Sequence, residues 1–279
     1  MQILFKSVLA FAVIAAALID VTPTRAAEYA GVPAMRGVGT LRAQMDVSGS
    51  GLTRQITIAE FAADPTKPIR AYGIDMTKRI HLIIVSDDLQ VFMHVHPILG
   101  SDGRFRITNT FPRPALYHLY ADAVPADHGH AVFRFDVGID APAPSAAIRQ
   151  IGPSLDTASA GPYTVKMSDV SVQAGVDTPV LIEISKAGEP ASDLHPYLGA
   201  FAHIVAIGVA DLSYTHIHAM DTHAMAMGDD MTASMPSDAI VPATMDVHLN
   251  LARRGTYKVW IQFQGGTRVY AAPFVVTAH

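Results

Sequence analysis

The sequence predicts an all-β protein built from two tandem β-sandwich domains. Three observations support this fold class: short apolar segments rich in Val, Ile, Phe, Tyr and Thr, frequent turn residues between them, and an internal repeat. Short β-rich runs separated by turns are typical of sandwiches and barrels, and no long segment has the period of a helix. The expected strands cover residues 54–58, 81–85, 91–95, 116–121, 132–137, 179–184, 203–207, 257–263 and 270–276.

The N-terminal segment has the pattern of a cleaved secretory signal. Lys6 precedes an almost wholly apolar run over residues 7–18, and small residues follow up to Ala26 and Ala27. The run is shorter than the roughly 20 residues of a spanning helix, and no Cys follows it for lipid attachment. We therefore expect residues 1–26 to be a signal peptide and the protein to be periplasmic or secreted, without stable membrane insertion.

The chain repeats itself in its second half. His81 begins an apolar segment that ends at His-Val-His, and His203 begins one that ends at His-Ile-His, each histidine being displaced by 122 positions. Further on, residues 117–120 match residues 257–260 at a displacement of 140, so the second half contains an insertion. The repeat predicts domains at 27–140 and 154–279, joined by a proline-containing linker at 141–153.

Composition limits the classes of function. The chain has 20 Lys+Arg against 25 Asp+Glu, and without the signal these become 18 against 24, a net charge of −6. Because no basic stripe is present, we expect no nucleic-acid partner. Without Cys there is neither a disulfide nor a thiolate ligand, which excludes a blue-copper centre. Thirteen His and 12 Met are the unusual counts, and they direct attention to metal binding.

The spacing of the histidines lets three imidazoles meet in each half. If residues 81–85 and 91–96 form a hairpin that turns at Asp88-Leu89, His96 faces His81 and His94 faces Ile83. Opposed residues share a face with Cβ atoms about 5 Å apart, within the reach of one ion. A one-residue slip would separate them. The predicted metal ligands are His81, His94 and His96 in the first half and His203, His216 and His218 in the second.

The insertion in the second half is rich in Met and His. Met220, His223, Met225 and Met227 are predicted accessory ligands in a metal-catching loop. Thioethers favour Cu(I) and imidazole also suits copper, so we expect copper, as Cu(I) or Cu(II), with zinc as second choice. The alternative is that these methionines fill gaps in the core. The turn at His128-Gly129-His130 is either a further metal site or an exposed loop.

The segment from His81 to Pro97, followed by Asp102-Gly103-Arg104-Phe105, resembles an uncharacterised family of bacterial exported proteins with a repeated His…His-x-His-Pro motif. This family is similar to YtkA-like and other immunoglobulin-like periplasmic domains associated with copper handling. The resemblance covers about residues 80–135 and 195–275, and Ala219 in place of a proline is a departure. It implies immunoglobulin- or cupredoxin-like sandwiches.

Three functions compete. The leading hypothesis is a periplasmic copper chaperone, buffer or resistance factor with a periplasmic or membrane copper-transfer partner. The second is a tandem interaction or adhesion module, in which the histidines are structural and bond to backbone carbonyls or to carboxylates such as Asp75 and Asp193. A metalloenzyme is third, because three His with an open position resemble catalytic zinc, but no general base lies at a suitable spacing. We therefore expect no enzyme activity.

Overall fold

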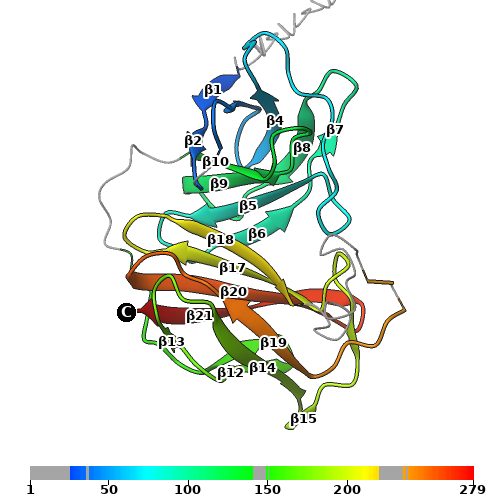
Figure 1. Cartoon of the computed structure of the whole chain (residues 1–279), viewed down its shortest axis with the longest axis vertical. Helices are drawn as coiled ribbons and strands as arrows, with labels where there is room; N and C mark the ends of the chain where they lie inside the picture. Colours follow the sequence, from blue (N-terminus) through cyan, green and yellow to red (C-terminus); the bar gives the residue numbers. More distant parts are fainter. Residues whose placement is uncertain (1–25, 36–37, 141–148, 150, 220–234, 237) are drawn as a thin grey trace, which may run out of the picture.

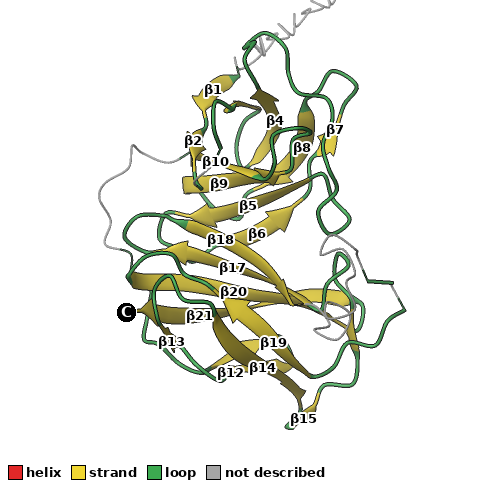
Figure 2. Ribbon diagram, in the orientation of Figure 1, coloured by secondary structure: helices red, strands yellow, loops and turns green. Residues whose placement is uncertain are grey.

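The computed structural model describes residues 26–35, 38–140, 149, 151–219, 235–236 and 238–279. Within these ranges the regular secondary structure is β-strand (Figures 1 and 2). The same residues contain no helix that is long and apolar enough to cross a membrane. Four sheets form two β-sandwiches, which confirms the predicted fold class.

The first sandwich consists of two five-stranded sheets. One has the order β1 (Ala27–Ala30), β3 (Arg42–Ser48), β4 (Thr53–Phe61), β8 (Phe105–Thr110) and β7 (Ile98–Leu99). The other has the order β2 (Val32–Pro33), β10 (Ala131–Ile139), β9 (Ala115–Ala123), β5 (Ile80–Ser86) and β6 (Phe92–Val95). Their inner faces enclose a core that includes Met45, Ile58, Phe105, Leu119 and Phe133.

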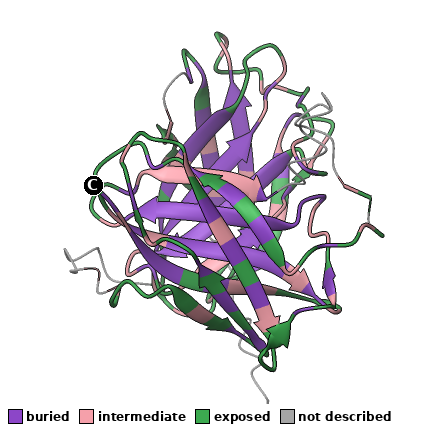
Figure 3. Cartoon of the chain, turned by 60° about the horizontal axis from the view of Figure 1, so that its bottom comes forward, coloured by how far each residue is buried: buried purple, intermediate pink, exposed green. Residues whose placement is uncertain are grey.

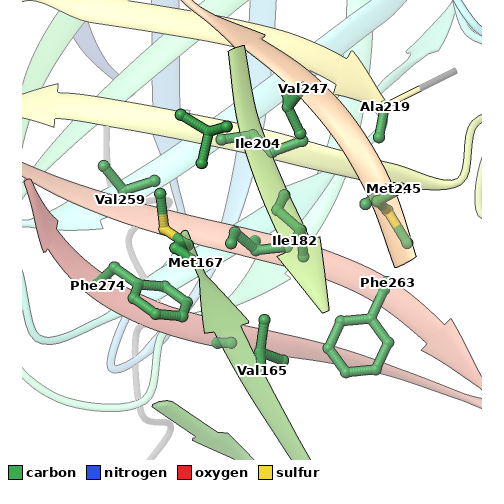
Figure 4. Packing of buried hydrophobic residues seen from close by; sticks show 14 of the residues in the cluster. Val165, Met167, Ile182, Ile204, Ala219, Met245, Val247, Val259, Phe263 and Phe274 are labelled. Carbon is green, nitrogen blue, oxygen red and sulfur yellow. The ribbon is translucent and has the colours of Figure 1, made fainter. Parts of the chain in front are cut away.

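The second sandwich repeats this plan. One sheet has the order β11 (Thr157–Ala160), β12 (Tyr163–Met167), β14 (Thr178–Lys186) and β15 (Glu189–Pro190), with β19 (Thr244–Leu249) also paired to β14. The other has the order β13 (Ser171–Val172), β21 (Arg268–Ala278), β20 (Gly255–Gly265), β17 (Ala202–Gly208) and β18 (Tyr214–Ala219), with β16 (Leu194–His195) on β20. Figure 4 shows side chains such as Val165, Ile182 and Phe274 filling the space between these sheets.

The nine strands expected from the sequence are all present, but the prediction missed interior strands such as β3 and β8 as well as short edge strands. Each of the nine expected segments falls on an observed strand: β4, β5, β6, β9, β10, β14, β17, β20 and β21. The strands that it missed include two-residue pieces such as β2, β13 and β15, which are too short to show an alternating pattern. The predicted linker at 141–153 lies largely outside the described residues.

Strands β5 and β17 are buried on both faces. Every residue of Ile80–Ser86 and of Ala202–Gly208 is buried. One face of each strand packs into its own sandwich, whereas Ile83 and Val205 belong to a third apolar cluster shared by both halves. The sheets that contain β5 and β17 therefore pack against each other, and Figure 3 shows buried strands running through the middle of the molecule. Figure 1 shows β5 and β6 lying beside β17 and β18.

The two sandwiches meet through reciprocal contacts. The ring of Phe92 stacks on Trp260, with centroids 4.9 Å apart. Tyr214, the repeat equivalent of Phe92, stacks on Tyr120, the equivalent of Trp260, at 4.8 Å. Because the repeat turns the Phe92–Trp260 pair into the Tyr214–Tyr120 pair, with the two halves exchanged, the halves are related by an approximate two-fold axis.

A residue of the connecting segment reinforces this interface. The Arg149 guanidinium donates to the backbone carbonyl of Asp87 in the first half at 2.7 Å and to that of Val209 in the second at 2.6 Å. It also donates to the Asp87 carboxylate at 2.6 Å. Through these hydrogen bonds the Arg149 side chain connects the two halves.

Candidate metal centre

Both histidine hairpins have the predicted register. In the first half Ile83 lies opposite His94. In the second half His203 lies opposite His218, and Val205 lies opposite His216. Histidines of one hairpin therefore project from one face of their sheet, away from the core of their own sandwich.

The two sets of histidines meet in one cluster at the interface between the sandwiches. The ring centroid of His81 is 5.1 Å from that of His94 on the same hairpin. It is 5.2 Å from His216 and 6.0 Å from His203, both on the other hairpin. The sequence predicted a separate site in each half, because it could not show that the two sheets pack face to face. The structure instead forms a single six-histidine cluster from His81, His94, His96, His203, His216 and His218.

The potential ligand atoms in this cluster are close together. One ring nitrogen each from His81, His94 and His96 lie within 4.8 Å of one another. The same holds for His81, His203 and His216, a group that spans both halves. The cluster therefore offers three-nitrogen groups within one sandwich and across the interface.

Two histidines bond to backbone carbonyls at equivalent positions. Nε2 of His81 donates to the carbonyl of Asp75 at 3.1 Å. Nε2 of His203 donates to the carbonyl of Tyr197 at 3.0 Å. Since a carbonyl only accepts hydrogen bonds, it fixes the imidazole proton on Nε2 and leaves Nδ1 with a lone pair.

Two further histidines bond to side chains of the opposite half. Nδ1 of His94 donates to Oε1 of Gln262 at 2.7 Å. Nδ1 of His216 donates to Oδ2 of Asp122 at 3.2 Å. Asp122 and Gln262 are equivalent in the repeat and lie opposite His81 and His203 on the neighbouring strands. Both acceptors fix the proton on Nδ1, so Nε2 carries the lone pair.

The lone pairs of these four rings face one another. Nδ1 of His81 lies 2.9 Å from Nε2 of His94, and Nδ1 of His203 lies 3.2 Å from Nε2 of His216. Both rings of each pair donate their N–H to an acceptor outside the pair, so no hydrogen atom lies between the two facing nitrogens. Two imidazole nitrogens on one tetrahedral ion lie about 3.3 Å apart, given metal–nitrogen distances of about 2.0 Å. The spacing therefore fits a shared cation.

His96 and His218 lie at the edge of the cluster. Each is half-buried, whereas His81 is 1% exposed and His203 is fully buried. Nε2 of His96 is 3.2 Å from Nε2 of His94. Nε2 of His218 is buried and has no hydrogen-bond partner among the described residues. A buried imidazole nitrogen without a partner is unfavourable.

Burial favours the neutral form of five of the six histidines. Burial and the neighbouring imidazoles lower the pKa of His81, and they lower the pKa values of His94 and His203 much further. The same causes lower the pKa of His96 to about 3 and that of His218 to about 2. Because metal ligands must be unprotonated, these rings are ready to bind at neutral pH without releasing protons.

Asp122 is a buried carboxylate that the sequence analysis did not select. Its oxygens accept hydrogen bonds from the Tyr214 hydroxyl at 2.7 Å, from Nδ1 of His216 and from Nε2 of His130. Burial alone would raise the pKa of Asp122, but the hydrogen bonds from His130 and His216 outweigh it and hold the pKa far below its usual range. The available signal was a carboxylate in a largely apolar strand, at the repeat position of Gln262.

The other predicted residues have different positions. Met220, His223, Met225 and Met227 lie outside the described residues. His130 bonds to Asp122, and this contact raises the pKa of His130. The Asp193 carboxylate contacts Tyr163 and Lys186. These contacts give Asp193 partners other than the histidines it was considered to hold.

These features define a two-sandwich β-protein with buried histidine triads that can hold a metal ion. The chain belongs to the family described as domain of unknown function (DUF8832), which matches residues 41–141 and 157–279. No curated protein matches it.

A solved structure of the FN1-FN3 domains of chicken CNTN1 is similar at 12% identity, with a TM-score of 0.20. The match covers 83% of this chain and 66% of that one, so the chain spans just under two thirds of that structure's length. At this score the similarity carries no argument about function.

Proposed function

We propose that this protein is an exported, periplasmic copper-binding protein that acts as a copper chaperone, buffer or resistance factor. The observation that carries the proposal is the arrangement of lone pairs in the histidine cluster. Four imidazoles donate their only proton outward and turn their free nitrogens toward one another. Buried acceptors facing each other repel, and a cation between them removes the repulsion.

Ligand chemistry favours copper among the possible ions. The described site offers imidazole nitrogens and no thiolate, and imidazole binds copper and zinc well. A buried charge is costly in a medium of low dielectric constant, and the cost rises with the square of the charge. Cu(I), with a single charge, therefore suits this shielded cluster better than a divalent ion, and zinc is the second choice.

The burial of the ligands favours storage or transfer over catalysis. His81 and His203 are covered almost completely, and the side chain of His216 is 2% exposed. A catalytic metal keeps a position open to substrate. A cluster enclosed between two sandwiches instead protects its ion from water and from other ligands, as sequestration requires.

The alternative is an interaction or adhesion module with structural histidines. The bonds from His81 and His203 to backbone carbonyls support it, since buried structural histidines make such contacts. It leaves the facing lone pairs of the cluster without a role. The two functions differ in one measurable property, which is uptake of metal.

Metal titration tests the proposal. The purified protein is titrated with Cu(I), Cu(II) and Zn(II), beside a variant with His94, His96, His216 and His218 replaced by Ala. A matched control replaces the exposed His195 and His248, which lie outside the cluster. We expect tight Cu(I) binding that the control retains and the cluster variant loses. Absence of binding, or binding unchanged in the cluster variant, would favour the interaction module.

A further inference from the structure

Four of the six histidines form a nearly regular tetrahedron. The ring centroids of His81, His94, His203 and His216 are separated by 5.1, 6.0, 5.2, 5.4, 5.5 and 5.5 Å over the six possible pairs. Pairs within a hairpin and pairs across the interface have similar separations. The four rings therefore surround one point between the sandwiches.

This spacing is that of a four-imidazole metal site. A tetrahedral ion holds imidazole nitrogens at about 2.0 Å, and each ring centroid lies roughly 1.1 Å farther out, which places centroids about 5.1 Å apart. The observed range starts at that value and extends less than 1 Å beyond it. Small rotations of the rings would close the difference.

The same four rings are those whose outer nitrogens are bonded to acceptors. His81 and His203 use backbone carbonyls, and these two residues are equivalent in the repeat. His94 and His216 use Gln262 and Asp122 of the opposite half. Metal-binding histidines usually donate their second nitrogen in this way, which fixes the tautomer and the ring orientation.

We propose that the cluster holds a single tetrahedral ion on the approximate two-fold axis, bound by His81 and His94 from the first half and His203 and His216 from the second. This inference rests on the proposed function and replaces one ion per hairpin by one ion per chain. The ion joins the two sandwiches, so binding depends on both halves. His96 and His218 lie outside the tetrahedron, near its more exposed side.

The shared site differs from two separate sites in how metal binding responds to the removal of ligands from one half. If each hairpin bound its own ion, loss of the second hairpin's ligands would leave one ion in the first. In the shared site, removal of His203 and His216 leaves only two of four ligands, and the intact first hairpin is not sufficient. Removal of the exposed His195 and His248, which lie outside the cluster, leaves all four ligands in place.

Native mass spectrometry and competition titration with Cu(I) and Zn(II) test this proposal on the whole protein. We expect one ion per chain. The double variant His203→Ala/His216→Ala should lose more than about 100-fold in affinity, since outer-shell changes alone cause losses of about 10- to 100-fold. The matched control His195→Ala/His248→Ala, which changes two exposed histidines outside the cluster, should keep one ion with unchanged affinity. Two ions per chain, or one ion retained after loss of His203 and His216, would overturn the shared site.

X-ray absorption on the unmodified protein provides a test that does not depend on folding of a variant. One ion with four imidazole nitrogens at a single short distance supports the proposal, and three nitrogens would contradict it. Failure of the proposed function has a different signature, because the unmodified protein would then bind no ion at all.

Discussion

Nδ1 of His216 in the second half lies 3.2 Å from Oδ2 of Asp122 in the first, so a buried carboxylate of one sandwich orients a candidate ligand of the other. At the equivalent position Gln262 accepts from His94 through a neutral amide. The two halves of the cluster therefore share a geometry and differ in charge. A carboxylate raises the basicity of the imidazole that it holds and so strengthens the metal bond.

We expect Asp122→Asn to lower metal affinity by about 10- to 100-fold, because the neutral amide keeps a similar shape and removes the charge. Competition titration measures this change. Asp193→Asn, which alters a carboxylate bonded to Lys186 and Tyr163, is the matched control and should leave affinity unchanged. Equal affinities for Asp122→Asn and the original protein, with both folded, would rule out this role.

Gln262→Glu is the complementary change. It places a carboxylate of nearly the same shape beside Nδ1 of His94 and should raise metal affinity, because it reproduces on the first hairpin the contact that Asp122 makes on the second. The double variant with Asp122→Asn should recover part of the lost affinity. Metal titration of Asp122→Asn, Gln262→Glu and the double variant measures these changes in affinity. A fall in affinity with Gln262→Glu would contradict the prediction.

Metal should also stabilise the folded protein. An ion that binds only the native state adds about 4 kcal/mol to the free energy of unfolding at a free concentration 1,000 times the dissociation constant. For a chain of this size each kcal/mol raises Tm by about 2–4 °C, so we expect a rise on the order of 10 °C. Thermal unfolding with and without Cu(I) measures it. The variant His94→Ala/His216→Ala should show no rise, and His195→Ala should show the full one.

Trp260 gives an optical reading of the interface, because it is the only Trp in the chain. It is 4% exposed and its ring stacks on Phe92 of the other half. Phe92→Ala should uncover the indole, shift its emission to longer wavelength and destabilise the protein by about 1–3 kcal/mol, less than the loss of a fully buried Phe.

A half-buried aromatic of the first sandwich provides the control for that prediction. Tyr29 on β1 packs against the first core and does not belong to the stacked pair. Tyr29→Ala should lower stability without a shift in emission. An unshifted spectrum for Phe92→Ala would mean that Phe92 does not shield Trp260 in solution.

Much of the cluster could be predicted from the sequence because it depends on local register. The position of His94 opposite Ile83 follows from the hairpin turn and from the alternation of side chains along a strand. The same reasoning applied to His203 and His218. Local geometry of this kind is set by residues close together in the chain, and the repeat provided a second instance of it.

The face-to-face packing of the two sheets was not predicted, although a signal for it was present. Antiparallel strands with one solvent-exposed face alternate between apolar and polar residues. Strand Ile80–Ser86 is instead apolar on both faces apart from His81 and Ser86. An unbroken apolar run of this kind indicates a strand covered on both sides. Contacts such as His216 with Asp122 join residues far apart in the chain, so local pattern could not identify them.

Glu60 predicts a pH dependence of stability that is separate from the metal ligands. Its side chain is fully buried, and neither carboxyl oxygen has a hydrogen-bond partner among the described residues. Burial, with a contribution from the Asp122 charge, raises the pKa of Glu60 from 4.5 to about 8. The folded protein therefore holds a proton on Glu60 at neutral pH that the unfolded chain releases.

The sign follows from this difference in proton binding. Because the folded state binds the extra proton, Glu60 makes its full contribution to the free energy of unfolding below pH 4.5. That contribution falls as the pH rises toward 8. The loss amounts to several kcal/mol, at about 1.4 kcal/mol per pKa unit. Glu60→Gln keeps the shape without the ionisable proton, so the variant should be more stable than the original at pH 8 and similar at pH 4.5. Urea unfolding across this pH range measures the two slopes, and parallel slopes would show that Glu60 is already ionised in the folded protein.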